Sequence, residues 1–400
     1  MTPLTYCEEL GRELQSILRY WMLYTPDERR GGFIGRIDDQ DIPDADAPRG
    51  LVLNARILWA FSAAWRYTGQ WVYRPVATRA YEYLAANFFD KEYGGAFWSL
   101  TASGEPLNKR KQIYGQAFAL YGLSEYYRAI GDQPVLDQAI ELYRLIEKHG
   151  FDPRYGGYFE AFDCDWMPLE DVRLSEKDAN EKKTMNTNLH VLEAYTNLYR
   201  VWPNEGLRER IRQLLDVFTT HIADKTTGHL GLFFTERWAP RSTIVSYGHD
   251  IEAGWLLHEA ALAIEDGERE KQLACLALQL AASVERGLDA DGGLWYERKD
   301  GRHVPEKHWW PQAEAMVGYL HVWRISGESR WWQRSAGVWD FVKKYIRHPR
   351  GKEWYWGVNA DHTPMTGEDK VGFWKCPYHN SRACLEIMRM LEGVHLDILP

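Results

Sequence analysis

The sequence has 400 residues, a formal net charge of −9, and 45% hydrophobic and 26% charged residues. These proportions are typical of a globular chain with a large core and exclude a disordered one. The chain has no lysine- and arginine-rich cluster to bind nucleic acid and no run of ~18 apolar residues to cross a membrane. Residues 1–10 show no signal-peptide pattern, so we expect a cytoplasmic protein without nucleic-acid or membrane partners.

The cysteine pattern fits the same compartment. An odd and dispersed set without a Cys-x-x-Cys pair argues against both a disulfide framework and a thiolate zinc site. The five cysteines are Cys7, Cys164, Cys275, Cys376 and Cys384.

A glycine-aromatic turn recurs about every sixty residues along the chain. This period is too long for tetratricopeptide, ankyrin or armadillo repeats and suits two helices with a connection. Six copies are present, the last of them degenerate, at residues 31–33, 94–98, 156–159, 231–234, 292–296 and 351–356.

Two kinds of helix pattern alternate around these turns. Segments before a turn, such as 7–22, 72–88, 135–149 and 207–222, mix apolar and charged residues at helical spacing and predict half-solvated outer helices. Segments after a turn, such as 57–65, are apolar nearly all round and predict inner helices packed on both sides. We expect an all-α (α/α)6 barrel, a toroid of six inner and six outer helices, with short β-hairpins at one rim.

The toroid is favoured over an open solenoid because solenoid ends need polar capping repeats, and the terminal repeats here are as apolar as the others. One domain would then span residues 1–400.

Three connections between a turn and the next inner helix are long: 38–49, 161–184 and 358–376. Long loops in a compact domain are usually functional, so we expect them to wall a pocket.

The inner helices open with polar or ionisable residues, although the rest of each helix is apolar. In a toroid these openings converge on one end of the central cavity, where they form a candidate ligand site. A lone buried histidine is more often a hydrogen-bonded core residue, which we expect among His258, His308 and His321. Three histidines at equivalent repeat positions, His190, His249 and His379, instead favour a functional role. The polar openers are Arg56, Tyr114, Asn186, His190, His249, Glu252, Trp310, Gln312, Glu314, His379 and Asn380.

We predict neither a metal nor a cofactor. His249 and Glu252 are spaced i, i+3 on one helix face and could form half of a metal site, but no second motif completes it. We expect Glu252 instead to hold His249 in one tautomer and to raise its basicity. Phosphate-binding glycine loops and nucleophile elbows are missing from the sequence.

Tryptophan is abundant, with 19 residues. Most should pack in the core, because large aromatic side chains dominate protein interiors. Trp310 precedes a proline in a helix start, and Trp374 lies between Phe373 and Lys375. Both tryptophans could be packing wedges, or they could sandwich a pyranose ring, whose C–H faces are apolar.

The helix openings resemble those of the N-acylglucosamine 2-epimerase family, most closely the branch that acts on cellobiose. The resemblance covers essentially the whole chain, and its segments are specific together rather than singly. They are residues 47–59, 185–195, 248–253, 308–315 and 373–380. The sequence departs from the family pattern at Asn188, Cys376 and Ser381.

The resemblance implies that His249 and His379 are the acid/base pair, with Arg56 and His190 near the reacting oxygens. It also implies that no cofactor takes part, that the partner is a small disaccharide, and that the protein is a monomer or homodimer. The residues that it implies for sugar binding are Tyr114, Asp178, Asn186, Glu252, Trp310 and Trp374.

The implied activity is inversion of C2 of the reducing-end glucose in a β-1,4-linked disaccharide such as cellobiose or lactose, through ring opening and an enediolate. Within the same family, the alternatives are a mannobiose 2-epimerase and a monosaccharide epimerase or isomerase. A more remote alternative is a glycoside hydrolase, which would need two carboxylates from Asp178, Glu252 and Glu314. A non-catalytic sugar-binding toroid is the last.

Overall fold

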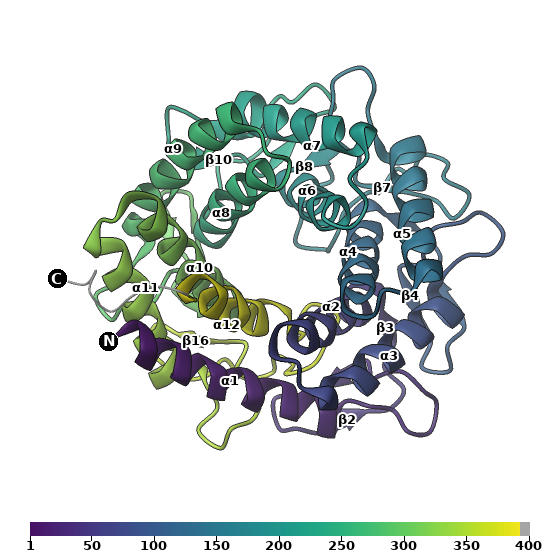
Figure 1. The fold of residues 1–400 in the computed structure, drawn as a ribbon, viewed down its shortest axis with the longest axis horizontal. Coiled ribbons are helices and arrows are strands. Elements are labelled where there is room, and N and C mark those ends of the chain that lie inside the picture. Colours follow the sequence, from purple (N-terminus) through teal and green to yellow (C-terminus); the bar gives the residue numbers. More distant parts are fainter. Residues whose placement is uncertain (393–400) are drawn as a thin grey trace.

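The computed structural model describes residues 1–392 and consists of two concentric rings of helices (Figure 1). Outer and inner helices alternate along the chain, as the hydrophobic pattern predicts. The outer ring is α1 (Pro3–Tyr24), α3 (Arg74–Tyr83), α5 (Gln133–Leu145), α7 (Glu205–Val217), α9 (Gly267–Val284) and α11 (Ser329–Phe341). The inner ring is α2 (Leu51–Thr68), α4 (Ile113–Ile130), α6 (Met185–Tyr199), α8 (Tyr247–Ala263), α10 (Trp309–Ser326) and α12 (Tyr378–Leu391). The fold is an all-α toroid of the (α/α)6 type.

Burial follows the ring to which each helix belongs. Inner helix α2 buries every residue of 51–64, because other helices pack on both of its sides. Outer helix α1 buries mainly one stripe, which includes Tyr6, Leu10, Ile17 and Trp21. Helix α12 packs against α2, and α1 packs against α12, so the last repeat meets the first and closes the ring. None of the helices within residues 1–392 is long and apolar enough to cross a membrane.

Most outer helices end in a short turn of different pitch that leads into the glycine-aromatic turn. Four of these segments are π-helical and are Leu84–Phe88, Ile146–Gly150, Phe218–Ile222 and Val342–Ile346. A 3₁₀ turn, Glu285–Gly287, follows α9, and another, Trp71–Tyr73, precedes α3.

Glycine is required in these turns, as Gly157 shows. Its φ of 72° lies in the left-handed region, and a Cβ there would lie 2.4 Å from Cζ2 of Trp238 in the next repeat. A larger residue would push successive repeats apart.

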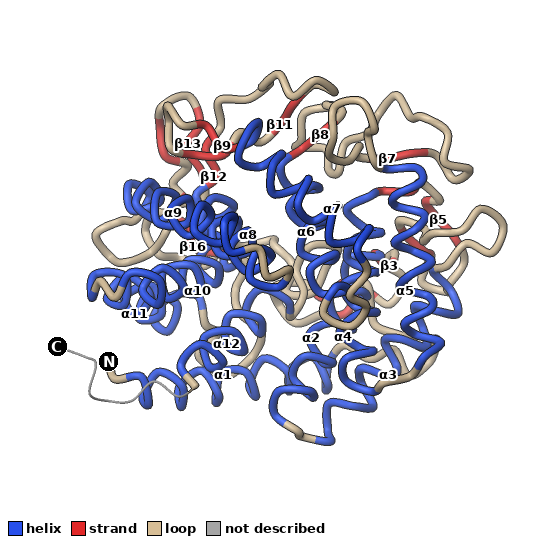
Figure 2. The backbone as a smooth tube through the Cα atoms, turned by 45° about the horizontal axis from the view of Figure 1, so that its top comes forward, coloured by secondary structure: helices blue, strands red, loops and turns tan. Residues whose placement is uncertain are grey.

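Short antiparallel strands lie among the loops at the rim where outer helices end and inner helices begin, which we call the strand rim (Figure 2). The expected hairpins are present as β1–β2, β4–β5, β9–β10 and β13–β14. The other pairs, β3–β4, β6–β7, β8–β11, β12–β13 and β15–β16, join successive repeats. The strands are β1 (Arg36–Ile37), β2 (Pro43–Asp44), β3 (Arg49–Gly50), β4 (Ser99–Leu100), β5 (Pro106–Asn108), β6 (Lys111–Gln112), β7 (Ala161–Phe162), β8 (Lys183–Thr184), β9 (Ala223–Asp224), β10 (His229–Leu230), β11 (Phe233–Phe234), β12 (Val245–Ser246), β13 (Glu297–Lys299), β14 (Arg302–His303), β15 (Glu306–His308) and β16 (Gly357–Asn359).

A buried ion pair holds most inner-helix starts to the turn before them. Lys183 lies just before α6, and its Nζ is 2.6 Å from Oδ2 of Asp152. The equivalent pairs are Arg49 with Asp27, Lys111 with Asp90, Lys307 with Asp289, and Lys375 with Glu353. The repeat that leads into α8 has Val245 at this position.

A side-chain amide provides a second link in three repeats. The fourth residue of the helix accepts from and donates to the backbone of one turn residue, which fixes the rotation of the helix about its own axis. The pairs are Gln116 with Ala96, Asn188 with Tyr158, and Gln312 with Leu294. Helix α8 uses a carboxylate instead: Asp250 accepts from Leu230 N at 2.8 Å and contacts His229 Nδ1 at 2.7 Å.

Candidate functional site

The sixth residue of each of five inner helices lies at the same height, facing the axis of the ring, and Arg382 of α12 joins this layer. Hydrogen bonds and ring contacts link its members across the axis. The layer consists of Arg56, Phe118, His190, Glu252, Glu314 and Arg382. The three predicted histidines therefore do not occupy equivalent positions. His190 belongs to this layer, whereas His249 and His379 lie nearly one turn closer to the strand rim.

The guanidinium of Arg382 is the centre of the layer. One nitrogen, Nη2, donates to Oε1 of Glu252 at 2.5 Å and to Oε1 of Glu314 at 2.6 Å. The other, Nη1, binds Glu193 and the hydroxyl of Tyr378. All of these side chains are buried, so low dielectric strengthens their interactions. Arginine suits this position because its planar fork can serve several carboxylates at once.

Glu193 fixes the tautomer of His190, which lies one turn before it on α6. Oε2 of Glu193 is 2.8 Å from Nδ1 of His190, and Oε1 accepts from Tyr378 at 2.5 Å. Burial opposes ionisation of Glu193, but Arg382 and His190 overcome it and lower the pKa of the carboxyl to about 2. An ionised carboxylate can only accept, so Nδ1 of His190 carries the proton and Nε2 has a free lone pair.

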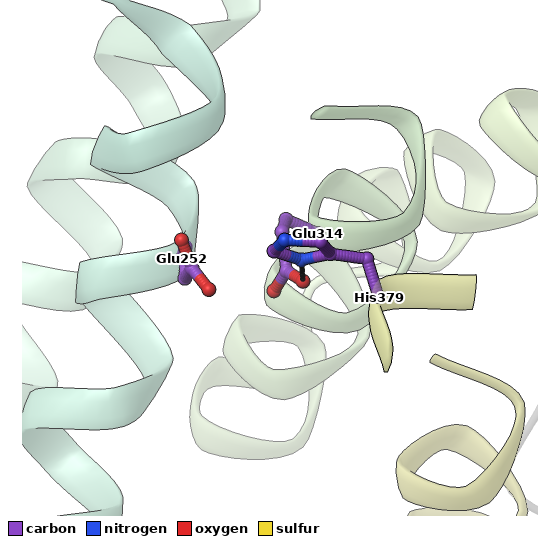
Figure 3. A group of neighbouring side chains, drawn as sticks. All are labelled: Glu252, Glu314 and His379. Atoms are coloured by element: carbon purple, nitrogen blue, oxygen red, sulfur yellow. Dashed lines mark hydrogen bonds and ion pairs between the residues drawn. The ribbon is translucent and has the colours of Figure 1, made fainter. Parts of the chain in front are cut away.

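Glu314 has the same relation to His379. Oε1 of Glu314 is 2.6 Å from Nδ1 of His379, and Oε2 accepts from Trp255 at 3.2 Å. Figure 3 shows Glu314 and His379 side by side. With Arg382 also donating, three donors point at this carboxyl, so Nδ1 of His379 is the protonated nitrogen. Nε2 of His379 is then the basic nitrogen.

His249 has a hydroxyl partner instead of a carboxylate, which corrects the role expected for Glu252. Nδ1 of His249 lies 2.8 Å from Oγ of Ser246, while Glu252 is bound to Arg382. A hydroxyl can donate or accept, so both tautomers of His249 are open to it. His249 and His379 both lie beside the ring of Trp310, with centroid distances of 4.7 Å and 5.7 Å.

Burial keeps the three histidines neutral. It lowers the pKa of His190 and His249 and brings the pKa of His379 well below the ordinary value of 6.5. Neighbouring positive or titratable groups, Arg56 and Arg382 among them, add to the effect at His379. Each imidazole can therefore accept a proton at neutral pH.

Arg56 supplies a fixed positive charge beside these imidazoles. Nη2 donates to the hydroxyl of Tyr114 at 2.8 Å, and the guanidinium lies over the rings of Phe118 at 4.1 Å and Tyr378 at 4.6 Å. Tyr114 in turn meets the ring of His190 edge to face at 5.1 Å. Nε of Arg56 is buried and has no hydrogen-bond partner among the described residues.

The remaining sugar-binding candidates differ in their surroundings. Asn186 is partly exposed, and its Oδ1 has no hydrogen-bond partner within residues 1–392. Trp374 is also partly exposed and leans over Tyr114, with 6.0 Å between ring centroids. Asp178 lies on the 161–184 loop, where its carboxylate accepts from Ser175 N and Oγ, both at 2.8 Å. Its charge acts on Tyr296, whose ring meets that of Trp310 at 6.3 Å. Two of the predicted polar helix openers, Gln312 and Asn380, instead bind turn residues, at Leu294 and Glu353.

The only group of potential metal ligands found among residues 1–392 is Glu252, Glu314 and His379 (Figure 3), whose ligand atoms lie within 4.8 Å of one another. Arg382 binds both carboxylates, and Glu314 holds the protonated nitrogen of His379. A guanidinium thus already provides the positive charge that these carboxylates would take from a metal ion.

Sequence reasoning gave no site role to several residues that organise this layer. Glu314 was named as a polar helix opener and as a candidate carboxylate of a hydrolase. Helical spacing was the available signal: Glu193 follows His190 by three residues, and Arg382 follows His379 by three. The full set is Glu193, Ser246, Trp255, Glu314, Tyr378 and Arg382.

The three departures from the family pattern have different surroundings. Asn188 forms the side-chain amide link to the backbone of Tyr158 and also donates to the carbonyl of Thr184. Ser381 donates to the carbonyl of Pro377. Sγ of Cys376 lies 4.0 Å from Nη1 of Arg56, so Cys376 is the one of the three that touches the site.

The fold and this set of groups define the class as an α-helical toroid enzyme whose centre is equipped to move protons. A family model described as N-acylglucosamine 2-epimerase matches residues 32–383. A cellobiose 2-epimerase from Bacteroides fragilis is 47% identical over 384 residues, which cover 95% of this chain and 98% of that protein. Another, from Dictyoglomus turgidum, is 38% identical and covers 91% and 93%.

The structural comparison agrees with the sequences. The structure of the cellobiose 2-epimerase from Bacillus thermoamylovorans B4167 matches with a TM-score of 0.92 and 39% identity, covering 96% of this chain and 99% of that one. This chain belongs to the N-acylglucosamine 2-epimerase family.

Proposed function

We propose that this protein inverts C2 of the reducing-end glucose in β-1,4-linked disaccharides, converting cellobiose to glucosyl-mannose and lactose to epilactose. Relatives of 38–47% identity that cover nearly the whole chain support the substrate class. The observation that carries the chemistry is the pair of neutral imidazoles, His249 and His379, that both lie beside the partly exposed Trp310. Inversion needs a group that removes a proton from one face of C2 and another that returns one to the opposite face.

The reaction begins with ring opening, because C2–H becomes acidic only beside a free C1 aldehyde. A histidine assists the transfer of a proton from O1 to O5. In the next step, one of His249 and His379 takes the C2 proton and becomes an imidazolium. The other takes up a proton from solvent beside the negative enediolate and supplies it to the opposite face of C2, and the first imidazolium then releases its proton to solvent. Their low pKa values keep both as free bases before the reaction, and proton transfer of this kind contributes ~10²–10⁴-fold to rate.

The intermediate is an enediolate, whose negative charge must be stabilised. Arg56 keeps its charge at all working pH values, and a positioned donor of this kind contributes ~3 kcal/mol. Tyr114, bound to Arg56, and His190 lie beside it. If the proton returns to C1 instead of C2, the product is a ketose, so slow formation of lactulose from lactose is an expected side reaction.

Sugar binding in this proposal uses the aromatic and amide groups around the histidines. Trp310 and Trp374 stack on the pyranose rings, and the free Oδ1 of Asn186 accepts from a sugar hydroxyl. Asp178 binds the second sugar unit from the long loop. Glu252, in the layer centred on Arg382, also binds the sugar.

The proposal also places one catalytic domain over residues 1–400, acting as a cytoplasmic monomer or homodimer without metal or cofactor. The free state of all five cysteines is compatible with a reducing compartment.

A hydrolase mechanism fits this geometry poorly. Glycosidases hold two carboxyl groups ~5–9.5 Å apart with the scissile bond between them. Here Glu252 and Glu314 share one nitrogen of Arg382, which fills the space that a sugar would need. A mannobiose 2-epimerase or a monosaccharide isomerase needs the same proton chemistry and differs only in the sugar bound.

The test is to incubate the EDTA-treated protein with cellobiose, lactose, mannobiose, mannose and N-acetylglucosamine and to identify the products by NMR. The proposal expects glucosyl-mannose and epilactose as main products. Faster turnover of mannobiose or of a monosaccharide would reassign the substrate. Release of free glucose would point to hydrolysis, and binding without turnover to a sugar-binding protein.

A further inference from the structure

Three buried carboxyl groups surround a single guanidinium in the central layer. Glu193, Glu252 and Glu314 all contact Arg382, and each is at most 5% exposed. Three ionised carboxylates facing Arg382 and the nearby Arg56 would leave one negative charge uncompensated in a low-dielectric interior. Such an excess is too unfavourable to persist, and a carboxyl group relieves it by keeping its proton.

Hydrogen-bond donors indicate which carboxyl group keeps a proton. Glu193 accepts hydrogen bonds from His190, Tyr378 and Arg382. Glu314 likewise has three donors, of which two bind Oε1 and Trp255 binds Oε2. Glu252 has only Arg382 on Oε1, and its Oε2 accepts no hydrogen bond from any residue in 1–392. Ionised carboxylates are stabilised by the donors that they receive, so Glu252 has the least support for a negative charge.

The position of Glu252 beside Glu314 acts in the same direction. Their oxygens lie within 4.8 Å of each other, and two carboxyl groups so close do not both ionise readily. Burial and the Glu314 carboxylate raise the pKa of Glu252 to about 8, despite the opposing effect of Arg382. Burial also raises the pKa of Glu314, but Arg382 and Trp255 oppose that rise.

We propose that Glu252 is held as a neutral carboxylic acid in the resting site and donates a hydrogen bond from Oε2 to the oxygen on which the enediolate charge develops. Glu252 lies one turn from His249 on the same face of α8, so both side chains face the same part of the site. An ionised carboxylate there would repel the intermediate. A neutral acid stabilises it, as in other enzymes that keep a carboxylic acid protonated at neutral pH.

The charged and titratable groups that face Glu252 come from every other inner helix and from α8 itself. They are Arg56 on α2, Tyr114 on α4, Glu193 on α6, Glu314 on α10, Tyr378 and Arg382 on α12, and His249 one turn before Glu252 on α8. The identity of the oxygen that accepts this hydrogen bond rests on the proposed function. The protonation state of Glu252 does not depend on that function.

The direct test is infrared spectroscopy of the full-length protein without substrate. The wild-type protein near neutral pH should show the carbonyl-stretch band of a protonated carboxylic acid, and Glu252→Gln should remove a component of that band. Glu125→Gln is the matched control. Glu125 is equally buried, but Arg66 and Arg128 lower its pKa against the effect of burial, so its substitution should remove no such component.

Raising the pH of the wild-type protein should abolish the same component as Glu252 ionises. Burial also raises the pKa of Glu160 to about 8, so the titration is made in Glu160→Gln, where it tests the inference even if Glu252→Gln does not fold. A band that Glu252→Gln leaves unchanged, or one that high pH leaves unchanged in Glu160→Gln, would overturn the inference, even if the protein epimerises cellobiose normally.

Kinetics test the catalytic part separately. Wild-type kcat should fall as pH rises through the ionisation of Glu252, and Glu252→Gln, which cannot ionise, should lack this alkaline limb. Glu252→Ala removes the donor and should lower kcat by ~10²-fold, more than it changes KM. An alkaline limb that persists in Glu252→Gln would assign it to another group and contradict the catalytic role. No turnover of any sugar by wild type would refute the proposed function but leave the infrared result intact.

Discussion

At the scale of single residues, the site depends on which nitrogen of each histidine carries the proton. Carboxylates hold Nδ1 of His190 and His379, which leaves Nε2 of each as the basic atom. His249 is bound only by the Ser246 hydroxyl and can use either nitrogen. This difference suits a pair in which one member starts as base and the other supplies a proton.

His379→Asn should lower kcat for cellobiose by ~10³-fold, because asparagine can still donate to Glu314 but has no basic nitrogen. Steady-state kinetics with product analysis measures this effect. His303→Asn, in an exposed strand, is the control and should keep the wild-type rate. A His379→Asn enzyme with near-normal kcat would remove His379 from the proton route.

Arg56→Lys should lower kcat by ~10–100-fold with little change in KM. Lysine keeps the charge but loses the flat contacts on Phe118 and Tyr378 and the defined bond to Tyr114, so the charge no longer points at the developing oxyanion. Steady-state kinetics, which gives kcat and KM separately, measures this effect. A raised KM at unchanged kcat would mean that Arg56 only binds substrate.

At the scale of elements, a buried ion pair fixes the first turn of five inner helices within residues 1–392, and a side-chain amide adds a second link in three of them. A buried cation binds a turn carboxylate, and a side-chain amide binds a turn backbone. Helix α8, which carries His249 and Glu252, has Val245 in place of the cation and Asp250 in place of the amide. The departure from the repeat therefore occurs in a helix that carries two of the proposed site residues.

Lys183→Met should lower the free energy of unfolding by ~3–5 kcal/mol, because it leaves Asp152 buried without its partner. Urea unfolding followed by circular dichroism measures the loss. Arg173→Met is the control, since its pair with Asp171 is exposed and should make no measurable difference. Equal effects of the two variants would show that the buried pair does not stabilise the ring.

At the scale of the whole molecule, the sequence predicted the architecture because both of its signals are periodic. The glycine-aromatic turns marked the repeats, and the contrast between stripe-like and all-round apolar helices separated the rings. The strand pairs between successive repeats were not predicted. Strands as short as β6 and β7 have no pattern of their own, and their partners lie about a full repeat apart.

The site was predictable in its residues but not in its connections. Helix starts revealed which side chains face the axis, yet the sequence suggested Glu252 as the partner of His249, whereas the structure gives that place to Ser246. Contacts between neighbouring helices depend on how the helices are rotated, which one-dimensional spacing does not determine. Arg382 escaped notice for the same reason, since its three partners lie on three other helices.

Stability and activity should both decline on the acid side. The three site histidines have folded-state pKa values below their unfolded value of about 6.5, so below that pH the unfolded chain binds more protons and stability falls. The histidines stay neutral until pH drops through the lower folded values, so the acid limb of kcat/KM should lie below about pH 6.5. Thermal unfolding and kcat/KM measured across this range test both statements. A midpoint above pH 6.5 would contradict neutral, buried imidazoles.

The most direct test of proton transfer at C2 is to incubate the EDTA-treated protein with cellobiose in D2O and to follow the reducing-end C2 proton by NMR. The account predicts glucosyl-mannose with deuterium at C2, and loss of both signals in His379→Asn. Glucosyl-mannose that keeps its original C2 proton in full would contradict exchange at C2 by two separate histidines. Recovery of unlabelled cellobiose with no product would contradict the proposed activity itself.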